Sequence, residues 1–407
     1  MDACRACQSR NMYLFLRLGA HPPASRVLAA EELTLDESKF PLDVHVCLDC
    51  ALIQVPDFIP PEFYRHYFYV PSASETMHRH FDDMADMLLS RFASDRSDRI
   101  VDIGSNDGLF LKACKDKGGT TLGIEPAANL TEIARSKGID VVNEYFNPTT
   151  ARQVRSEYGS ARVIVTTNTF NHIDDLHSFM EGITLLLDDE GVFVVEVPQA
   201  LDLVEKNEFD TIYHEHLSEF SVKSLVDLYA FSDMEVFDIE RLEIHGGSMR
   251  VFGQKVGASR DVCPVVDEWI QNERNGALFD RATYETFRER VNENKRNTMS
   301  MLKRLKQEGR TLAGYGAPSK GNTLLNYYGI DSNYLDFVAD RSTLKQGRYT
   351  PGSHIPIVAP DKILEVQPDY LLLLAWNFAD EILKQQAEYR SRGGKFIVPI
   401  PEPHIVD

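Results

Sequence analysis

The sequence is short of positive charge and has no long apolar run. Lys and Arg together number 43 against 62 Asp and Glu in 407 residues, which gives a formal net charge of −19. Because nucleic acids are polyanions that bind basic surfaces, this balance argues against a nucleic-acid partner. No stretch of 18 apolar residues occurs, so we expect no membrane span. The opening MDACRACQSR has no apolar core of a signal peptide, and we therefore expect a cytoplasmic protein.

Cysteine is scarce as well, but four of the six cysteines form two pairs of equal spacing. Each pair has the form Cys-x-x-Cys, which places two thiolates on one tight turn. Two such turns complete a tetrahedral set of four sulfurs, the geometry that zinc prefers. Four unrelated buried thiols, or a redox pair, are the alternatives. Because four protein ligands leave no open position for a substrate, we expect a structural zinc site. The expected ligands are Cys4, Cys7, Cys47 and Cys50.

A glycine turn follows a predicted strand at residues 99–103. The string VDIGSNDG places Gly104 and Gly108 between this strand and a predicted helix, and a second strand at 121–124 ends in Glu125. Glycine lets the backbone turn sharply and approach a ligand closely. An acid at the tip of the second strand binds the hydroxyls of a ribose, so the pattern predicts an adenosine-containing cofactor. With Asp102 before the first glycine, the string resembles the S-adenosylmethionine (SAM) loop of class I methyltransferases.

Predicted helices and strands alternate through the middle of the chain. Further strands are expected at 140–142, 163–167 and 191–197, followed by an antiparallel hairpin at 236–244 and 249–256. This alternation implies a parallel sheet covered on both faces, and five parallel strands before a hairpin resemble the class I methyltransferase order. Ligands bind at the carboxyl ends of such strands, with Phe146 beside the adenine and Asn168 at the methionine part. The expected cofactor residues are Asp102, Gly104, Ser105, Asn106, Gly108, Glu125, Phe146 and Asn168.

Four consecutive residues with titratable side chains follow the fifth predicted strand. They are Tyr213, His214, Glu215 and His216. Clustered titratable groups at the ligand edge of such a sheet suggest proton chemistry. Zinc binding by His214 and His216 is a competing interpretation, because their spacing suits a strand, but a third ligand is not evident. A histidine buried in hydrogen bonds is the structural alternative.

The last third of the chain predicts a second α/β sheet. One or two helices are expected over 265–306, followed by strands at 311–315, 337–339, 370–375 and 395–398. A glycine loop, GYGAPSKG, occupies 314–321 and precedes a helix. On its own this loop could hold NAD, because phosphates bind at helix N-termini. Lys320 is either a phosphate ligand or a solvated helix charge.

These pieces together resemble the SAM-dependent C-methyltransferases that act on nucleotide-linked 4-keto-6-deoxysugars. The matching motifs are the two Cys-x-x-Cys pairs, VDIGSNDG, NTFNHI, VEVPQ, YHEH, HGGS and GYGAPSKGN, which cover the whole chain in family order. The resemblance implies a class I methyltransferase Rossmann-like domain between a small zinc-binding domain and a second Rossmann-like domain that holds the nucleotide sugar. We expect these domains at 76–264, 1–75 and 265–407, respectively.

The resemblance also implies site residues. The catalytic tyrosine, glutamate and second histidine of the family map onto Tyr213, Glu215 and His216, and a further histidine maps onto His172. A tyrosine-rich segment beside an active site can hold a sugar, and loop amides at a helix N-terminus suit a diphosphate. The expected substrate residues are therefore Tyr67, Tyr69, His245, Ser319 and Lys320.

The expected activity is methylation of a sugar carbon in deoxysugar biosynthesis. A ketone at C4 acidifies the hydrogens on C3 and C5, so a base can form an enolate that attacks the methyl group of SAM. We expect His216 to be this base, C3 to be the methylated carbon and the enzyme to be a monomer. The alternatives are C5 methylation, an RNA or protein methyltransferase that uses the zinc module as a reader, and a non-catalytic scaffold.

Overall fold

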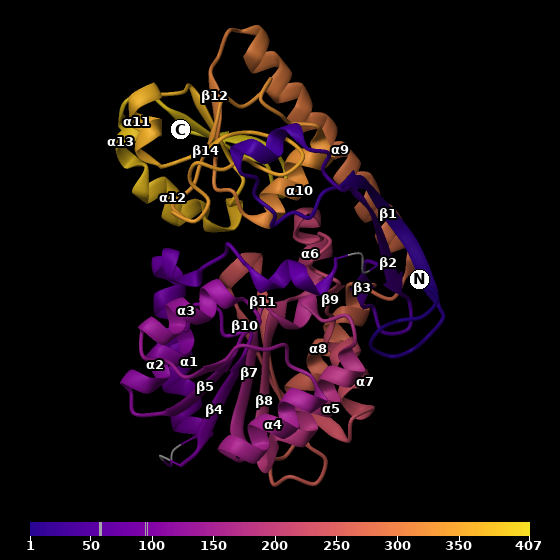
Figure 1. Cartoon of the computed structure of the whole chain (residues 1–407). Coiled ribbons are helices and arrows are strands. Elements are labelled where there is room, and N and C mark those ends of the chain that lie inside the picture. The colour runs from indigo at the N-terminus through magenta and orange to yellow at the C-terminus, as the bar shows by residue number, and fades with distance from the viewer. Residues whose placement is uncertain (57–58, 94, 96) are drawn as a thin grey trace.

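The computed structural model describes residues 1–56, 59–93, 95 and 97–407. Three sheets organise these residues (Figure 1). The first is antiparallel and has four strands in the order β1–β2–β3–β9. Its strands are β1 (Met12–His21), β2 (Phe40–Cys47), β3 (Ile53–Gln54) and β9 (Ser218–Glu219). Since β9 lies far along the chain, the N-terminal sheet is completed by the middle segment.

The second sheet has seven strands in the order β10–β11–β8–β7–β4–β5–β6. The last five of these are parallel, and β11 is antiparallel to both β8 and β10. The expected class I methyltransferase order with a closing hairpin is therefore confirmed. The strands are β4 (Arg99–Ile103), β5 (Thr120–Ile124), β6 (Val141–Val142), β7 (Ala161–Thr167), β8 (Leu187–Pro198), β10 (Met234–Leu242) and β11 (Ser248–Lys255).

Helices cover both faces of this second sheet. Alternate residues of one strand point to opposite faces, so Ile100 packs in one apolar cluster and Val101 in another. The cluster of Ile100 contains side chains of α1 and α2, and that of Val101 contains side chains of α4, α5 and α7. The helices are α1 (Glu75–Arg91), α2 (Leu109–Asp116), α3 (Ala128–Ser136), α4 (Pro148–Tyr158), α5 (Leu176–Leu186), α6 (Ala200–Glu205) and α7 (Val222–Ala230).

Two helices, α8 (Val265–Asn275) and α9 (Arg281–Gln307), lead to the third sheet. That sheet has the order β14–β13–β12–β15–β16–β17, and only its edge strand β17 is antiparallel to its neighbour. The expected second Rossmann-like sheet is present. Its strands are β12 (Leu312–Tyr315), β13 (Val338–Ala339), β14 (Ile357–Val358), β15 (Tyr370–Leu373), β16 (Lys395–Val398) and β17 (His404–Val406), and its helices are α10 (Ser319–Tyr328), α11 (Asp361–Val366), α12 (Ala379–Gln385) and α13 (Ala387–Ser391).

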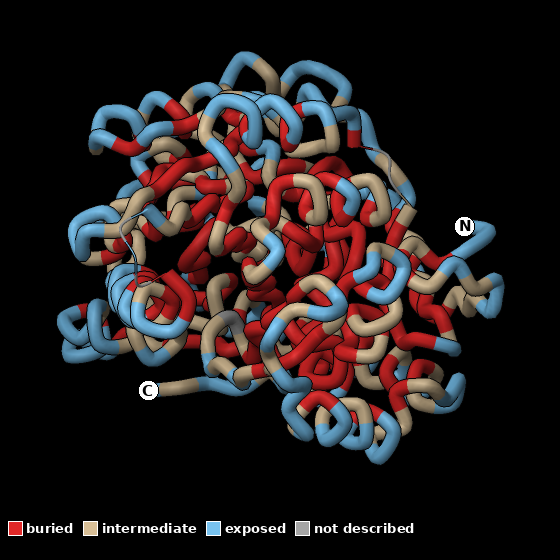
Figure 2. Tube along the Cα trace, turned by 90° about the horizontal axis from the view of Figure 1, so that it is seen from below, coloured by how far each residue is buried: buried red, intermediate tan, exposed pale blue. Residues whose placement is uncertain are grey.

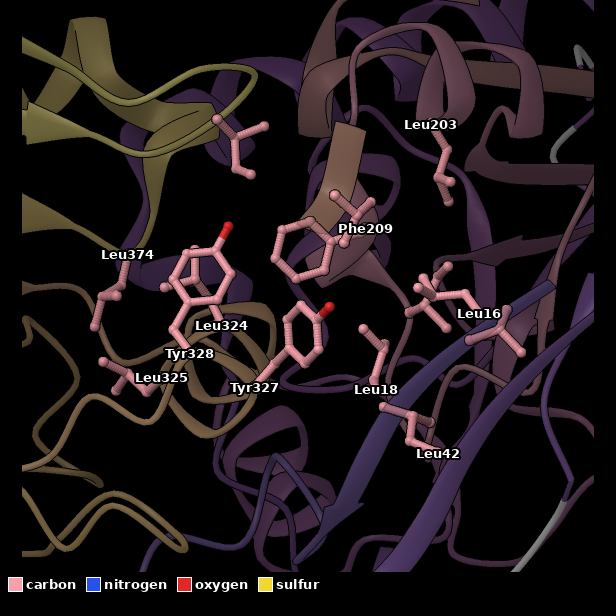
Figure 3. Close-up of a cluster of buried hydrophobic side chains, with 14 of the residues drawn as sticks. Leu16, Leu18, Leu42, Leu203, Phe209, Leu324, Leu325, Tyr327, Tyr328 and Leu374 are labelled. Carbon is pink, nitrogen blue, oxygen red and sulfur yellow. The ribbon is translucent and has the colours of Figure 1, made fainter. Parts of the chain in front are cut away.

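One apolar core joins the first and third sheets through α6 and the segment that follows it. Figure 3 shows Leu16 and Leu42 of the N-terminal sheet, Phe209 of the middle segment and Tyr328 of α10 in one cluster. The rings of Phe209 and Tyr328 stack with centroids 5.6 Å apart. Figure 2 shows the buried trace filling the interior, with the exposed trace confined to outer turns and helix faces. The first and third sheets thus share a core, while the two faces of the second sheet pack in separate apolar clusters.

Within the residues that the structure describes, we find no helix with the length and apolar character needed to cross a membrane.

Candidate active site

One cavity of about 580 Å³ lies between the carboxyl edge of the second sheet and the third sheet. Residues directly after β4, β5 and β7 line one end, and α10 and the segment after β15 line the other. The cavity therefore contacts both the predicted cofactor loop and the predicted substrate loop. The sequence-predicted residues that line it are Tyr67, Tyr69, Asp102, Gly104, Ser105, Asn106, Glu125, Phe146, Asn168, His172, Tyr213, His216, Ser319 and Lys320.

The glycine turn after β4 is built for close approach. Gly104 and Gly108 both have φ of +76°, a region that favours glycine. A Cβ atom on Gly104 would lie 2.2 Å from Thr169 Oγ1, so no other residue fits there. The backbone amide of Asn106 donates to Glu125 Oε2 at 2.8 Å, which ties the turn to the tip of β5. Sequence spacing and structure thus agree on a cradle formed by two strand tips.

Buried carboxylates make this end of the cavity suited to a cation. Burial, with the nearby Glu125, raises the pKa of Asp102 to about 8, and burial raises the pKa of Glu125 to about 7. Asp102 Oδ1 and Ser105 Oγ are buried without a hydrogen-bond partner among the described residues. Unpaired buried acceptors are costly, and a ligand ammonium, sulfonium or hydroxyl would satisfy them. These residues therefore fit the ammonium, sulfonium and ribose of SAM.

Phe146 and Asn168 flank the cradle, and their predicted contacts with the adenine and the methionine part of SAM stay predictions. The Phe146 ring packs edge-on against Phe179, with centroids 5.0 Å apart, and borders the cavity. Asn168 has φ of +53°, and its backbone amide donates to Glu196 O at 2.8 Å. Both side chains are therefore held at the cavity edge.

A hydrogen-bonded chain of three side chains crosses the reactive end of the cavity. Tyr213 Oη lies 2.5 Å from His216 Nε2, and His216 Nδ1 lies 2.9 Å from Glu219 Oε1. Asn171 donates from Nδ2 to the other oxygen of Glu219 at 3.2 Å. The ring of His172 stands perpendicular to that of His216, with centroids 5.0 Å apart. The structure thus brings together Tyr213, His216 and His172 as predicted, and adds Glu219.

Burial keeps these groups neutral. Burial, together with the positive charge of Lys320, lowers the pKa of His216 to about 3. Burial also lowers the pKa of His172 well below its ordinary value, and it raises the pKa of Tyr213 well above its ordinary value. The pKa of His216 in the assembled fold is therefore far below that of an ordinary histidine. Its conjugate acid needs an anion beside it, and Glu219 is the carboxyl group at that position, although burial raises the pKa of Glu219 well above its ordinary value.

Glu215 faces away from the cavity. Its carboxylate accepts hydrogen bonds from the backbone amides of Ser25, at 2.7 Å, and Ala24, at 3.3 Å. Ser25 Oγ in turn lies 2.6 Å from Ser319 Oγ and 3.4 Å from Tyr67 Oη. Glu215 therefore holds an N-terminal loop against the substrate end of the cavity.

His214 is also turned away. Its Nε2 lies 2.9 Å from Phe40 O, and burial lowers its pKa to about 4. Among the described residues, the four paired cysteines form the one group of three or more His, Cys, Asp or Glu that could hold a metal. The competing interpretation of His214 and His216 as zinc ligands is therefore wrong.

The substrate end combines aromatic, hydroxyl and ammonium groups. Tyr67, Ser319 and Lys320 line it, whereas Tyr69 lines the cavity beside the SAM loop, where its carbonyl accepts from Asn106 Nδ2 at 3.1 Å. The side chain of His245 lies outside what the structure describes. In the glycine loop the amide of Ala317 already donates to Asp340 Oδ2 at 2.7 Å.

The four predicted zinc ligands converge. Cys4 Sγ and Cys50 Sγ are 3.5 Å apart, Cys7 Sγ and Cys47 Sγ are 3.6 Å apart, and all four lie within 4.8 Å of one another. Sulfurs of a tetrahedral zinc site with bonds near 2.3 Å are separated by about 3.8 Å. The geometry therefore fits a four-thiolate zinc site, and the fully protein-made ligand set fits a structural one.

Sequence reasoning missed Glu219, Asn171 and Ser25. An acid three residues after a histidine is too common to indicate a site. Ser25 carries no motif, and only the fold brings it to Ser319 and Glu215. Glu219 is placed by a long-range strand pairing with Ile53, and this pairing leaves no recognisable pattern in the sequence.

Three family models match successive parts of the chain. One described as "Putative zinc binding domain" covers residues 4–64, "Methyltransferase domain" covers 77–236 and "C-methyltransferase C-terminal domain" covers 243–401. Over its length the chain is similar to the C-methyltransferase NovU of Streptomyces niveus, with 36% identity over 407 residues, 100% of this chain and 97% of that protein.

More distant likenesses cover less of the chain. An uncharacterized methyltransferase of Oceanobacillus iheyensis is 31% identical over 94 residues, which are 22% of this chain and 41% of that protein. The solved structure of a SAM-dependent methyltransferase from Anabaena variabilis overlaps 47% of this chain and 97% of its own, with a TM-score of 0.36 and 14% identity.

We predict one zinc ion per chain, bound by the four paired cysteines. Cys47→Ser should abolish zinc binding and lower the melting temperature, because metal binding to such a site stabilises the folded chain by about 10 kcal/mol or more. Elemental analysis and thermal unfolding measure both. Cys263→Ser, which alters an exposed cysteine outside the cluster, is the control and should keep its zinc. Purified protein without zinc, or a folded Cys47→Ser variant with full zinc content, would contradict the assignment.

We predict that SAM binds more tightly as pH rises. Glu125 and Asp102, with pKa values of about 7 and 8, are protonated at pH 6 and ionised at pH 9, and the ionised forms attract the cationic ligand more strongly. Glu125→Ala should weaken binding by about 1.5–3 kcal/mol, the loss of a hydrogen bond to a charged group. Calorimetry at both pH values measures this. Glu125→Gln should remove the lower titration step and move the remaining one to lower pH, because the charge of Glu125 no longer raises the pKa of Asp102. Affinity independent of pH in the wild type would disprove the assignment.

Proposed function

The chain belongs to the C-methyltransferase family, and from this premise we propose that it methylates C3 of a nucleotide-linked 4-keto-6-deoxysugar in deoxysugar biosynthesis. The chain is a SAM-dependent enzyme with a zinc-binding site in its N-terminal part. The observation that carries the sugar proposal is the chain Tyr213–His216–Glu219 in the cavity of the SAM loop. Methylation of an oxygen or nitrogen needs less of such proton-transfer apparatus.

The proposed reaction starts with proton removal beside the ketone. SAM, when bound, supplies an electrophilic methyl group. His216 takes the proton from C3 at Nε2, while Nδ1–H donates to Glu219. The carboxylate offsets the charge of the imidazolium that burial would otherwise disfavour. The Tyr213 hydroxyl is hydrogen-bonded to Nε2 of His216 in the structure. In the reaction it either moves its hydrogen bond to the substrate or relays the proton to Nε2.

The remaining predicted residues have supporting roles in this proposal. His172, perpendicular to His216, excludes water from the imidazole. Tyr67, Tyr69 and His245 hold the sugar, and Glu215 is a positioning residue that acts through Ser25. Ser319 and the loop amides at the N-terminus of α10 suit the diphosphate, since amides there point outward with partial positive charge. The net charge of −19 supports a small-molecule substrate rather than RNA.

The substrate class is tested with a small panel of nucleotide-linked 4-ketosugars, differing in nucleotide and in the C3 substituent. We expect one member to yield a product heavier by one methyl group, with the new methyl on C3 by NMR. A methyl on C5 would support the alternative position, and transfer to oxygen or nitrogen would disprove the proposal.

We predict that His216→Asn abolishes proton abstraction. In deuterated water, with ketosugar and S-adenosylhomocysteine, the wild type should exchange one hydrogen beside the ketone. Asn keeps the size of the side chain but removes the basic nitrogen, so exchange and methylation should both fall by about 100-fold or more while SAM affinity stays the same. Mass spectrometry follows the exchange.

The matched control is His214→Asn, because His214 is a buried neighbour whose ring faces Phe40 instead of the cavity. It should exchange at the wild-type rate. Wild-type exchange by His216→Asn would mean that another group is the base. Glu219→Gln should slow exchange by about tenfold or more, since the neutral amide no longer offsets the imidazolium charge.

A further inference from the structure

Lys320 carries an ammonium group whose environment is unusual. Its Nζ is buried and has no hydrogen-bond partner among the described residues, although an ammonium has three donors. It lies 4.1 Å from the centroid of the Trp376 ring. An aromatic face attracts a cation but leaves its N–H groups unused. A buried charge in this state is costly unless a ligand completes its hydrogen bonds.

Two elements fix this position from outside α10. Trp376 begins the 3-10 helix η7 (Trp376–Phe378), and its Nε1 donates to Asp210 Oδ2 at 2.8 Å. Asp210 belongs to the 3-10 helix η5 (Phe209–Thr211), directly before Tyr213. The indole that supports Lys320 is therefore anchored to the segment that carries the reactive tyrosine and histidine. Lys320 lines the same cavity as Tyr213 and His216.

The charge of Lys320 affects the pKa values of groups at the reactive end of the cavity. The ammonium and His216 border the same cavity, and the positive charge contributes to the low pKa of His216. It also opposes the rise that burial causes in the pKa of Glu219. The charge of Lys320 also favours the ionised forms of Asp210 and Glu208, although burial raises the pKa of both, that of Glu208 to about 7. In their ionised forms these carboxylates would repel a diphosphate, whereas an uncharged ketone is not repelled.

We propose that Lys320 is a catalytic residue whose ammonium donates a hydrogen bond to the C4 ketone oxygen and stabilises the enolate. The inference rests on the proposed function and differs from the diphosphate contact that the sequence suggests. The C3–H bond breaks, the proton passes to His216, and the electron pair forms the C3=C4 bond while the C4 oxygen becomes negative. Lys320 stabilises that oxygen. C3 then bonds to the methyl carbon as its bond to sulfur breaks, and the ketone re-forms.

The geometry explains how Lys320 and His216 can both be cationic in the intermediate. Two positive groups in one buried cavity repel each other, as the lowered pKa of His216 reflects. An enolate oxygen between them removes that repulsion. The enzyme thus stabilises the enolate state more than the ketone state, which is the requirement for catalysis.

The test compares Lys320→Met with Lys320→Arg. At saturating ketosugar with S-adenosylhomocysteine, Lys320→Met should slow deuterium exchange by about 100-fold, as for removal of one oxyanion donor, while its Kd for the sugar nucleotide changes by less than about threefold. Lys320→Arg keeps the charge and should recover part of the rate. SAM binding by calorimetry checks that each variant is folded.

The matched control is Lys206→Met. Lys206 donates a hydrogen bond to Gly246 O and forms an ion pair with Asp202. It is not among the described residues that line the cavity. Removing the same charge there should leave exchange at the wild-type rate.

An effect of Lys320→Met on binding affinity instead of on exchange rate would overturn the inference. If Lys320→Met exchanges at the wild-type rate when saturated but binds the sugar nucleotide and the free nucleoside diphosphate about 30-fold more weakly, the ammonium serves the diphosphate. If folded, SAM-binding wild type neither exchanges nor methylates any ketosugar, the proposed function fails, and this inference fails with it.

Discussion

The pairing of two very short strands, β3 and β9, is the constraint on which the active site depends. Ile53 pairs with Glu219 and Gln54 with Ser218, directly after the turn that holds Cys47 and Cys50. The same turn accepts a hydrogen bond from the side chain of Ser221 through Cys50 O. Because Glu219 contacts His216, the location of the carboxylate behind the imidazole is set by the cysteine cluster. The zinc site thereby positions the residue that contacts the imidazole.

A second long-range contact closes the opposite side of the cavity. Glu215 binds the backbone of Ser25, and Ser25 contacts Ser319 at the start of α10. Glu215, one of the four consecutive titratable residues at 213–216, thus joins the N-terminal loop to the third sheet through Ser25. Together with the shared apolar core, these bonds exclude water from the histidines. The shifted pKa values of His172 and His216 are a consequence of assembling three parts of the chain around one space.

The sequence predicts what is local, and fails where distant segments meet. The glycine turn, Glu125 and the cysteine pairs were predictable because each depends on spacing within a few tens of residues. The family motif correctly marked Tyr213 and His216 for the cavity, but could not reveal that Glu215 turns away from it. That orientation follows from a contact 190 residues distant, and the role of Glu219 follows from a strand pairing. The low pKa of His216 could not be predicted from the sequence for the same reason, since burial is a property of the assembled fold.

Charge balance within the cavity decides which protonation states the fold supports. Burial alone would protonate Glu219 and leave His216 without a counter-charge. The amide of Asn171 and the ammonium of Lys320 oppose this effect but do not cancel it, so the pKa of Glu219 stays well above its ordinary value. Ionisation of Glu219 would favour the tautomer with Nε2 free as an acceptor. Lys320 thus has two opposed effects on His216. Its charge lowers the pKa of the imidazole directly, and it favours the carboxylate form of Glu219 that would stabilise the imidazolium.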